Sequence, residues 1–587
     1  MKTLLAAVTV LAVSTTRADT IYVDSSCPGP GNGSEAEPYC SIQTAIDNAV
    51  NSDDVVVAPG TYFEAINFIG KAITLRSSAG ANATTINGSG FPHVVQCVSG
   101  EGPDTVLDGF WITGGNANSP FPGNLGGGMY IAFSLPTVIN CSFIGNSADL
   151  GGGLATNDSS PTVRHCTFQA NSADQGGGLF TVLGNPSITD CIIRNNSALF
   201  GGGIWTDSSD IVVTDCMFED NNAFLGGGGM HVIGGLPVVR GCTFRRNGTS
   251  LASGGGIRIE QTDTTVTHCK FEHCTAAVEG GGISIFGGSR VTLVSNCSFS
   301  GNSAGERGGG MENGGGGLQV VTNCTFTDNS SGMPGGGTYN SDGNPTFSNC
   351  IFWANQPDQI FPDGDGEVAY SNVQDGWPGT GNIDADPMFV DPDNGDFSLQ
   401  PGSPCIDAAD NTAVQEDVTT DLDGNPRFLD VPETPDTGNG TLPIVDMGAY
   451  ESLGGGCLAV TSQQIVCHAD GTSFTVTIEG LNACTGGTTQ VTFTASGGSV
   501  GQELCFTALV NDGGFCCSTE ICVMIPDCTP AALPSDLDGD GTVGMTDFLA
   551  LLGAWGPCSD CGTCPADFDG DCSVGILDLL TLLGNWE

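Results

Sequence analysis

The sequence predicts a mainly β protein whose largest part is a parallel β-helix, with three short strands in each coil and about 12 coils. The main observation is a repeat. Three glycines and then the motif Cys-x-Phe-x-x-Asn recur nine times between residues 126 and 357, with a period of 25 to 28 residues. Short β-branched or aromatic runs alternate with glycine and Asn-Ser turns, without a 3.6-residue periodicity, which indicates strands. A period of this length is typical of a solenoid, in which each coil buries its apolar face against its neighbours.

Equivalent residues of successive coils should form columns, because neighbouring strands lie about 4.8 Å apart. The cysteines and phenylalanines are expected to point into the core, where each Phe contributes about 1.5–3 kcal/mol. We interpret the cysteines as buried thiols; disulfides between coils are the alternative, although stacked positions have parallel Cβ vectors that suit them poorly. The asparagines should bond one another at a bend, and the glycines should form a corner with positive φ. The repeat cysteines are Cys141, Cys166, Cys191, Cys216, Cys242, Cys269, Cys297, Cys324 and Cys350.

The repeat region lacks the column of aspartates that marks a calcium-binding β-roll. The residue after the glycine triplet is apolar in most coils, as with Leu154 and Ile204. The GGG-Leu/Ile and Phe-x-x-Asn motifs of residues 120–360 resemble the repeats of chlamydial-type polymorphic outer-membrane proteins. This resemblance implies a right-handed β-helix displayed at a cell surface, in adhesion rather than catalysis.

Residues 1–18 are predicted to be a signal peptide: Lys2 gives a short basic start, an apolar run follows, and small residues end it. No later segment has 18 consecutive apolar residues, so no integral membrane segment is expected after signal removal. Export of a chain with 26 cysteines indicates an oxidising compartment. We therefore expect a secreted, extracellular or cell-surface protein.

The β-helix domain is expected to span residues 19–451, with an N-terminal cap over 19–60. Residues 21–66 resemble the opening of pectin-lyase-like β-helices, in which a short helix caps the first coil. Residues 41–51 have the character of such a helix. Cys27 and Cys40 would close a loop of about 14 residues, worth about 3 kcal/mol if bonded. The residues spaced for the buried helix face are Ile42, Ala45, Ile46 and Val50.

The tail of this domain is predicted over residues 361–451. Residues 382–451 resemble choice-of-anchor Q, a segment found on many exported bacterial β-helix proteins. The sequence Asp421-x-Asp423-Gly could begin a calcium loop, but its twelfth position is Pro432 rather than an acid. We interpret it as structural turn chemistry.

Pectin-lyase-like folds often carry lyases or glycosidases, but the motifs of those enzymes do not occur in order in this chain. Polygalacturonase-like enzymes use Asn-Thr-Asp, Asp-Asp, Gly-His-Gly and Arg-Ile-Lys, whereas here Arg258-Ile259 is followed by Glu260. The densest acids, which could supply a carboxylate pair, are interpreted as solvated turn residues; they are Asp210, Asp215, Glu219 and Asp220. Scattered arginines are interpreted as surface residues; they are Arg164, Arg240, Arg258 and Arg290. No catalytic residue is predicted.

The formal net charge of −51, with only 14 Lys and Arg residues, excludes nucleic acid and anionic membranes as expected partners. Surface solvation or calcium binding explains the acidity. Residues 452–530 hold eight cysteines among alternating β patterns and predict a small β-sandwich stapled by up to four disulfides. We interpret this module as a spacer, with carbohydrate binding as the alternative.

Residues 531–587 carry a duplicated calcium loop, which predicts two bound Ca²⁺ ions. Oxygen-bearing residues at positions 1, 3, 5, 7 and 12 recur 31 residues later, and calcium requires six to eight oxygens from such a hard, negative site. The backbone carbonyl serves at position 7. The predicted ligands are Asp536, Asp538, Asp540, Thr542 and Asp547 in the first loop, and Asp567, Asp569, Asp571, Ser573 and Asp578 in the second.

Each loop leads into an apolar helix, at residues 548–555 and 579–586, and no such helix precedes it. This duplicated loop and helix, with Asp at position 12, resembles a type I dockerin. The resemblance implies calcium-dependent docking to a cohesin-like module or other exported scaffold protein, with contacts at loop positions 10 and 11 (residues 545–546 and 576–577). The cysteines between the loops are interpreted as disulfide partners rather than iron–sulfur or zinc ligands; they are Cys558, Cys561 and Cys564.

The sequence therefore favours an exported, non-catalytic β-helix, in adhesion or glycan binding, that is docked by calcium to a cohesin-like partner. A polysaccharide-degrading lyase or O-glycosyl hydrolase of an extracellular complex is the alternative. A third hypothesis is a structural envelope protein whose tail only folds on calcium.

Overall fold

The computed structural model describes residues 18–453, apart from gaps at 119–122, 288–290, 315, 342–344, 364–365, 417 and 432–433, and parts of residues 458–584. The chain divides into two compact units, residues 1–454 and 455–587, which we describe separately. Within the described residues, no helix combines the length and hydrophobicity needed to cross a membrane.

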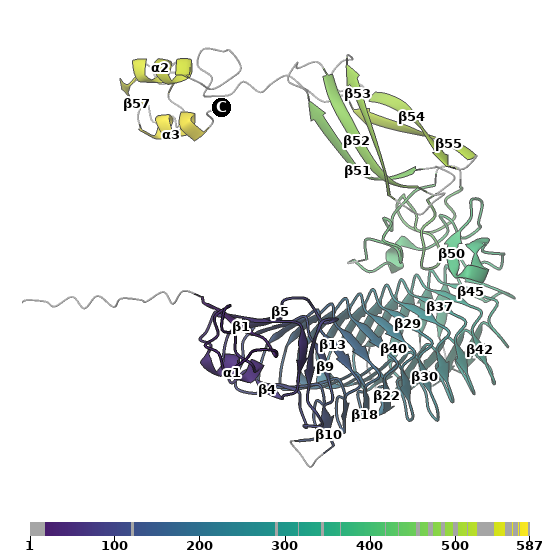
Figure 1. The fold of residues 1–587 in the computed structure, drawn as a ribbon. Helices are drawn as coiled ribbons and strands as arrows, with labels where there is room; N and C mark the ends of the chain where they lie inside the picture. The colour runs from purple at the N-terminus through teal and green to yellow at the C-terminus, as the bar shows by residue number, and fades with distance from the viewer. Residues whose placement is uncertain are drawn as a thin grey trace, which may run out of the picture. The chain divides into compact units, whose positions relative to one another are not determined.

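The first unit contains a parallel β-helix of about 11 turns, close to the expected number (Figure 1). One coil consists of β16 (Thr162–Arg164), β17 (Thr167–Gln169), β18 (Ser172–Gln175) and β19 (Leu179–Gly184). Each strand pairs in parallel with its equivalent one coil later, so that Phe168 lies opposite Ile193. Residues at equivalent positions of the sequence repeat are therefore paired in neighbouring strands of the same sheet.

Four parallel sheets run along the β-helix, and we name them by the strand that this coil contributes: sheet A (β16), sheet B (β17), sheet C (β19) and sheet D (β18). Sheet A has 14 strands, from β1 (Thr20–Val23) to β47 (Glu367–Ala369). Sheet B has 13, from β3 (Gly60–Tyr62) to β48 (Asn372–Val373), and sheet C has 12, from β4 (Ile66–Asn67) to β46 (Ile360–Asp363). Sheet D has nine short strands, from β10 (Asn116–Ala117) to β42 (Ser330–Ser331).

Sheet D corrects the expectation of three strands per coil. Most of its strands begin directly after the asparagine column, at residues that the sequence predicted to be turns. The asparagine side chains fix the bend at the same height in most coils. The residues that follow therefore stay in register and continue the parallel ladder for two to four residues.

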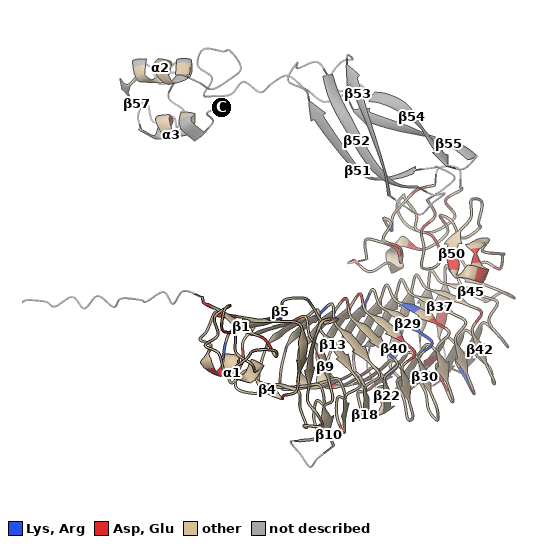
Figure 2. Ribbon diagram, in the orientation of Figure 1, with Lys and Arg blue, Asp and Glu red and all other residues tan. Residues whose placement is uncertain are grey.

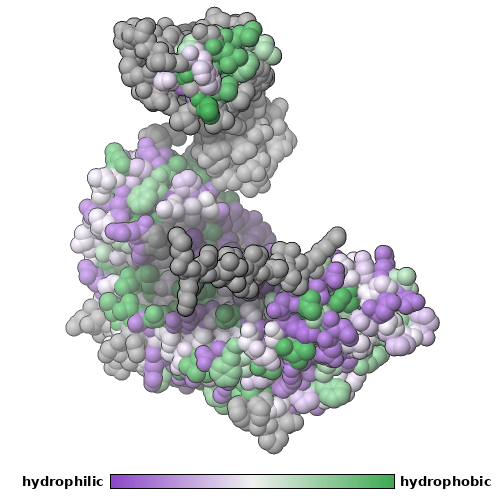
Figure 3. Space-filling model, turned by 90° about the vertical axis from the view of Figure 1, so that its left-hand side faces the viewer, coloured by the Kyte–Doolittle hydropathy of each residue, from purple (hydrophilic) through white to green (hydrophobic). Residues whose placement is uncertain are grey.

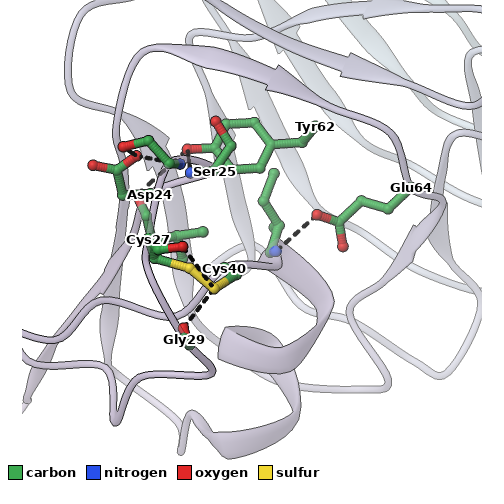
Figure 4. The surroundings of a disulfide bond; sticks show 10 residues. Asp24, Ser25, Cys27, Gly29, Cys40, Tyr62 and Glu64 are labelled. Carbon is green, nitrogen blue, oxygen red and sulfur yellow. Dashed lines mark hydrogen bonds between the residues drawn. A yellow bond between two sulfur atoms is a disulfide. The ribbon is translucent and has the colours of Figure 1, made fainter.

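The N-terminal cap contains the expected helix, α1 (Ile42–Asn48), and the expected disulfide between Cys27 and Cys40 (Figure 4). The carboxylate of Glu64 accepts the backbone N–H of Ile42 at 2.8 Å, which satisfies a free donor at the helix N-terminus. The helix ends earlier than predicted because Ala49 is extended. Ile42, Ala45 and Ile46 are buried as predicted, whereas Val50 lies beyond the end and is 53% exposed.

The cysteine and phenylalanine columns fill the core as predicted. All nine repeat cysteines are buried free thiols, which confirms the interpretation as thiols over disulfides between coils. Most donate to the carbonyl two residues earlier, as Cys166 does to Arg164 at 3.2 Å. Burial raises the pKa of the Cys166 thiol well above its usual value, so it stays protonated. The rings of Phe244 and Phe271 stack in parallel with centroids 4.9 Å apart.

The asparagine column forms the predicted ladder of side-chain amides. Asn196 is representative: its Nδ2 donates to the Phe168 carbonyl and to Oδ1 of Asn221, both at 2.9 Å, and its backbone N–H donates to the same Oδ1. Cys274 interrupts the ladder, and its thiol donates to the Phe244 carbonyl at 3.3 Å, where an amide would otherwise donate. The ladder thus satisfies backbone groups that the bend removes from the sheets.

The glycine triplets form the tight corners that the sequence predicted. The first glycine of each triplet has a positive φ, such as +66° at Gly176. A Cβ atom on the next residue, Gly177, would lie 2.5 Å from the carbonyl oxygen of Gly202 in the following coil. Glycine is therefore required at this corner both for backbone conformation and for the close approach of coils.

The tail packs on the last coils through its own small core. It contains β49 (Phe389–Asp391), β50 (Asp396–Leu399) and the short 3₁₀ turns η1 (Pro392–Asn394) and η2 (Asn411–Ala413). Arg427 is fully buried; it donates to the Gly448 carbonyl at 2.6 Å and lies 3.2 Å from the Glu451 carboxylate. The tail is therefore a structured extension of the β-helix.

The second unit contains the antiparallel strands expected for the cysteine-rich module. One sheet consists of β51 (Leu458–Cys467), β52 (Ser473–Asn482) and β53 (Thr488–Ser496), while β54 (Glu503–Asp512) pairs with β55 (Phe515–Met524). The predicted disulfides lie outside the described residues. The same applies to Cys558, Cys561 and Cys564.

Candidate functional site

The predicted calcium module is described in part. Ser573 lies in β57 (Ser573–Val574), and Asp578 lies in the first turn of α3 (Ile576–Gly584), where it is 1% exposed. Asp547 lies in α2 (Met545–Gly553), and its side chain is outside the described residues. The other predicted ligands also lie outside them; they are Asp536, Asp538, Asp540, Thr542, Asp567, Asp569 and Asp571.

Both helices that the sequence placed after the loops are present. They start three residues earlier than predicted, at loop position 10, so that the acid at position 12 lies in the first helical turn. Leu551 and Leu582 are fully buried and share one apolar cluster with Val574. The two helices therefore pack on one small apolar cluster, while the dockerin-like character of the module and its calcium ions stay predictions.

The acids that were densest in the sequence serve separate interactions. Glu219 and Asp220 both lie within 2.9 Å of Arg246, and Asp210 accepts the N–H of Leu236 at 2.8 Å. These contacts support the interpretation as turn acids. Asp215 alone of the four borders the groove described next.

A groove of about 350 Å³ lies between the β-helix and residues 420–424 of the tail, and we call it the tail groove. On the β-helix side it is lined by the ends and turns of β28 (Val238–Arg240), β29 (Thr243–Arg245) and β33 (Lys270–Glu272). Lys and Arg are sparse along the ribbon in Figure 2, yet two of them meet here. The ionisable side chains of the groove are Asp215, Arg240, His268, Lys270, Asp421 and Asp423.

The tail loop is fixed against the β-helix by polar contacts. The Thr420 carbonyl accepts Nδ2 of Asn296 at 2.8 Å, and Nε2 of His268 lies 3.1 Å from the same oxygen. The Asp421 carboxylate accepts the N–H groups of Asp423 and Asn425, at 3.0 and 2.7 Å. These bonds support the interpretation of Asp421 as structural turn chemistry.

The groove keeps a fixed pattern of charge. Burial lowers the pKa of His268, so its ring is neutral at pH 7. Burial also opposes the charge of Lys270, but Tyr450 and Asp423 outweigh it and raise the pKa of the amine. Lys270 lies 3.1 Å from Asp423, while Arg240 is exposed. The groove therefore offers cationic donors and anionic acceptors side by side.

A second group of charges lies on sheet C. Ser284 of β35 (Ile283–Phe286) alternates with core residues, so it faces away from the core, and its hydroxyl donates to Glu312 of β39 (Met311–Asn313) at 2.9 Å. Burial raises the pKa of Glu312 to about 8. Such a carboxyl has the protonation of a general acid. Because Glu312 is only 3% exposed, a polymer cannot reach it.

The sequence predicts Arg240 as a surface residue, and no pattern in it indicates the tail groove. Its lining comes from three coils and from a loop some 150 residues later, so no local spacing marks it. The one available signal was the scarcity of basic residues. Arg290, another of the four arginines interpreted as surface residues, lies outside the described residues.

The comparisons with known proteins confirm the right-handed β-helix. Residues 105–257, 187–319 and 255–374 match the family described as right handed beta helix region. Comparison with curated protein sequences finds no match.

Three solved structures illustrate the range of similar proteins. Pectate lyase Pel9A has 13% identity and a TM-score of 0.36, over 74% of this chain and 96% of the lyase. The Dettilon tailspike protein gp208 has 10% identity and a TM-score of 0.33, and the match covers 84% of this chain and 86% of the tailspike. The third structure is tailspike gp49 from Acinetobacter baumannii bacteriophage Fri1, a capsular polysaccharide depolymerase. It has 10% identity and a TM-score of 0.26, and the match covers 86% of this chain and 82% of the tailspike. We draw no inference about function from similarities of this size.

Proposed function

We propose that the chain is an exported, non-catalytic β-helix protein that binds a polysaccharide in the tail groove and docks through its C-terminal calcium module to a cohesin-like partner. The tail groove carries the first half of this proposal. Arg240 and Lys270 provide donors, and Asp215 and Asp423 provide acceptors, within one hollow of about 350 Å³. Sugar hydroxyl groups both donate and accept hydrogen bonds, so a mixed lining of this kind fits them.

Replacing Arg240 by Ala should weaken polysaccharide binding about 10-fold or more, because a hydrogen bond from a charged group contributes about 1.5–3 kcal/mol. The measurement is calorimetry of the full chain with neutral and uronate-bearing polysaccharides. The matched control is Arg164→Ala, since Arg164 occupies the same register column three coils earlier, outside the groove. Equal affinities for both variants and the parent would contradict the proposal.

Cleavage of the same polysaccharide is the second candidate function. It is favoured by one observation, the presence of Asp215 and Asp423 beside Lys270 in the groove, which could supply acid and base groups. Incubation with a polysaccharide panel, followed by assay for reducing ends and unsaturated uronates, separates the two functions. Turnover that Asp215→Asn abolishes without loss of binding would replace the non-catalytic proposal.

Exposed apolar side chains on the two helices support the docking half of the proposal. Met545 and Ile576 occupy loop position 10 in the two repeats and are 63% and 68% exposed, and Leu549 is 58% exposed. Figure 3 shows hydrophobic residues gathered on the described surface of this module. A duplicated apolar surface beside the calcium loops is suited to a protein partner.

The double substitution Asp536→Ala and Asp567→Ala should abolish the gain of helicity that calcium induces in the C-terminal module, because each change removes the carboxylate at loop position 1. Circular dichroism during a calcium titration measures this effect. Pull-down of exported proteins from the source organism, with and without EGTA, tests the partner. Helicity that persists in the double variant contradicts the ligand assignment, and retention of a partner in EGTA contradicts calcium-dependent docking.

A further inference from the structure

Three carboxylates converge in the tail, at a place that no spacing in the sequence marks. Asp407, Asp430 and Asp436 each offer one oxygen, and these oxygens all lie within 4.8 Å of one another. In Figure 2 the tail region around β50 carries many of the acidic residues. All three aspartates belong to the same compact unit. Asp430 and Asp436 lie 23 and 29 residues after Asp407 in the sequence.

Asp407 lacks the partners that a buried acid requires. Its side chain is fully buried, and within the described residues neither Oδ1 nor Oδ2 accepts a hydrogen bond of normal geometry, although the backbone N–H of Val431 interacts with the carboxylate. A buried carboxylate is costly unless it is paired or binds a metal ion. The neighbouring carboxylates of Asp430 and Asp436 repel a charged Asp407 at this distance.

The backbone holds the three acids together against this repulsion. The Asp407 carbonyl accepts the N–H groups of Thr437 at 2.9 Å and Gly438 at 3.1 Å, which places Asp436 beside it. The N–H of Asp407 donates to Asp446 at 2.8 Å, and the residue has a φ of +52°. Val431, next to Asp430, belongs to the same apolar cluster as Ile406 and Ala408. The convergence is therefore built by the fold.

We propose that Asp407, Asp430 and Asp436 bind a calcium ion that stabilises the tail, a site separate from the two C-terminal loops. Calcium binds oxygen ligands at about 2.3–2.6 Å, so ligands of one ion lie no more than about twice this distance apart, as these oxygens do. The site has no sulfur or imidazole ligand in the cluster, which disfavours zinc. Two of the three acids are exposed, so water can complete the coordination.

The nearby Asp421 loop does not compete for this role. Both of its carboxylate oxygens already accept hydrogen bonds, from Asn425 and from the N–H of Glu451 at 2.9 Å. Asp421 therefore accepts hydrogen bonds of normal geometry on both oxygens, whereas Asp407 accepts none within the described residues.

Equilibrium dialysis with radioactive calcium tests the proposal in the full chain carrying Asp536→Ala and Asp567→Ala, which disables the two predicted C-terminal sites. We expect one calcium ion per chain in this background and none after the further substitution Asp407→Asn. The control is Asp393→Asn, an exposed acid of the same tail, which should leave the ion bound. A background chain that binds no calcium, or an Asp407→Asn chain that binds as before, overturns the site.

Thermal unfolding gives a second test, because Asp407→Asn should change Tm in opposite directions relative to the parent without and with calcium. Without calcium, Asp407→Asn should raise Tm, because it removes a buried negative charge from between two others. With calcium in excess, the parent should gain Tm and the variant should not. The exposed substitutions Asp430→Asn and Asp436→Asn should each lower calcium affinity at least 10-fold, and an unchanged affinity in both overturns the assignment. If Mg²⁺ raises the Tm of the parent as much as Ca²⁺ does, the assignment of the site to calcium is wrong.

Discussion

Replacing Asn221 by Ala should destabilise the β-helix by about 3–5 kcal/mol, because several buried groups lose their partners at once and each costs about 1–3 kcal/mol when left unsatisfied. Nδ2 of Asn221 donates to the Ile193 carbonyl at 2.7 Å, and its Oδ1 accepts both the N–H and Nδ2 of Asn196. Alanine supplies none of these atoms. The bend is fully shielded from water, so no solvent replaces them.

Two substitutions frame this prediction. Asn222, the next residue, is exposed, so Asn222→Ala should change stability by less than about 0.5 kcal/mol. Cys274→Asn should have the opposite effect and raise stability, because it restores the amide that the ladder lacks at that coil. Thermal denaturation with amide hydrogen exchange in the neighbouring coils measures both. If Asn221→Ala lowers the stability no more than Asn222→Ala does, the asparagine ladder does not stabilise the bend.

The solenoid could be predicted from sequence because each of its features is repeated and local. A buried phenylalanine, thiol or amide that recurs every 25 to 28 residues has one simple structural explanation, and the structure confirms it for all three columns. Sheet D was missed for a physical reason. Its strands have the composition of turns, and the asparagine ladder before most of them holds adjacent coils in register.

The sites on the β-helix could not be predicted in the same way. The tail groove joins His268 to Thr420, and the acidic cluster joins Asp407 to Asp436, so both depend on how the tail folds back on itself or on the coils. Neither contact has a fixed spacing that a sequence pattern could reveal. The predicted calcium loops are the opposite case, since all proposed ligands of one ion lie within 12 residues and the spacing itself predicts the chemistry.

Replacing Glu312 by Gln should stabilise the β-helix at alkaline pH and have little effect at pH 5. Burial raises the pKa of Glu312 from its usual 4.5 to about 8, with Glu279 adding to the shift. The folded state therefore retains the proton between these two values, while the unfolded chain releases it. The parent loses stability progressively as pH rises from about 4.5 to 8 and no further above it, by up to about 3–5 kcal/mol. Glutamine cannot ionise, so the variant avoids this loss.

The measurement is the difference in Tm between Glu312→Gln and the parent, followed from pH 4.5 to 9. Glutamine retains an oxygen that can accept the Ser284 hydroxyl, so the hydrogen bond of 2.9 Å survives and ionisation is the main change. Glu367→Gln, at an exposed position of β47, should give a Tm difference near zero at every pH. A Tm difference for Glu312→Gln that stays constant over this range would mean that the buried carboxyl reaches water on ionisation. Sheet C would then have to open locally around β39, and the same pH rise should increase amide exchange there.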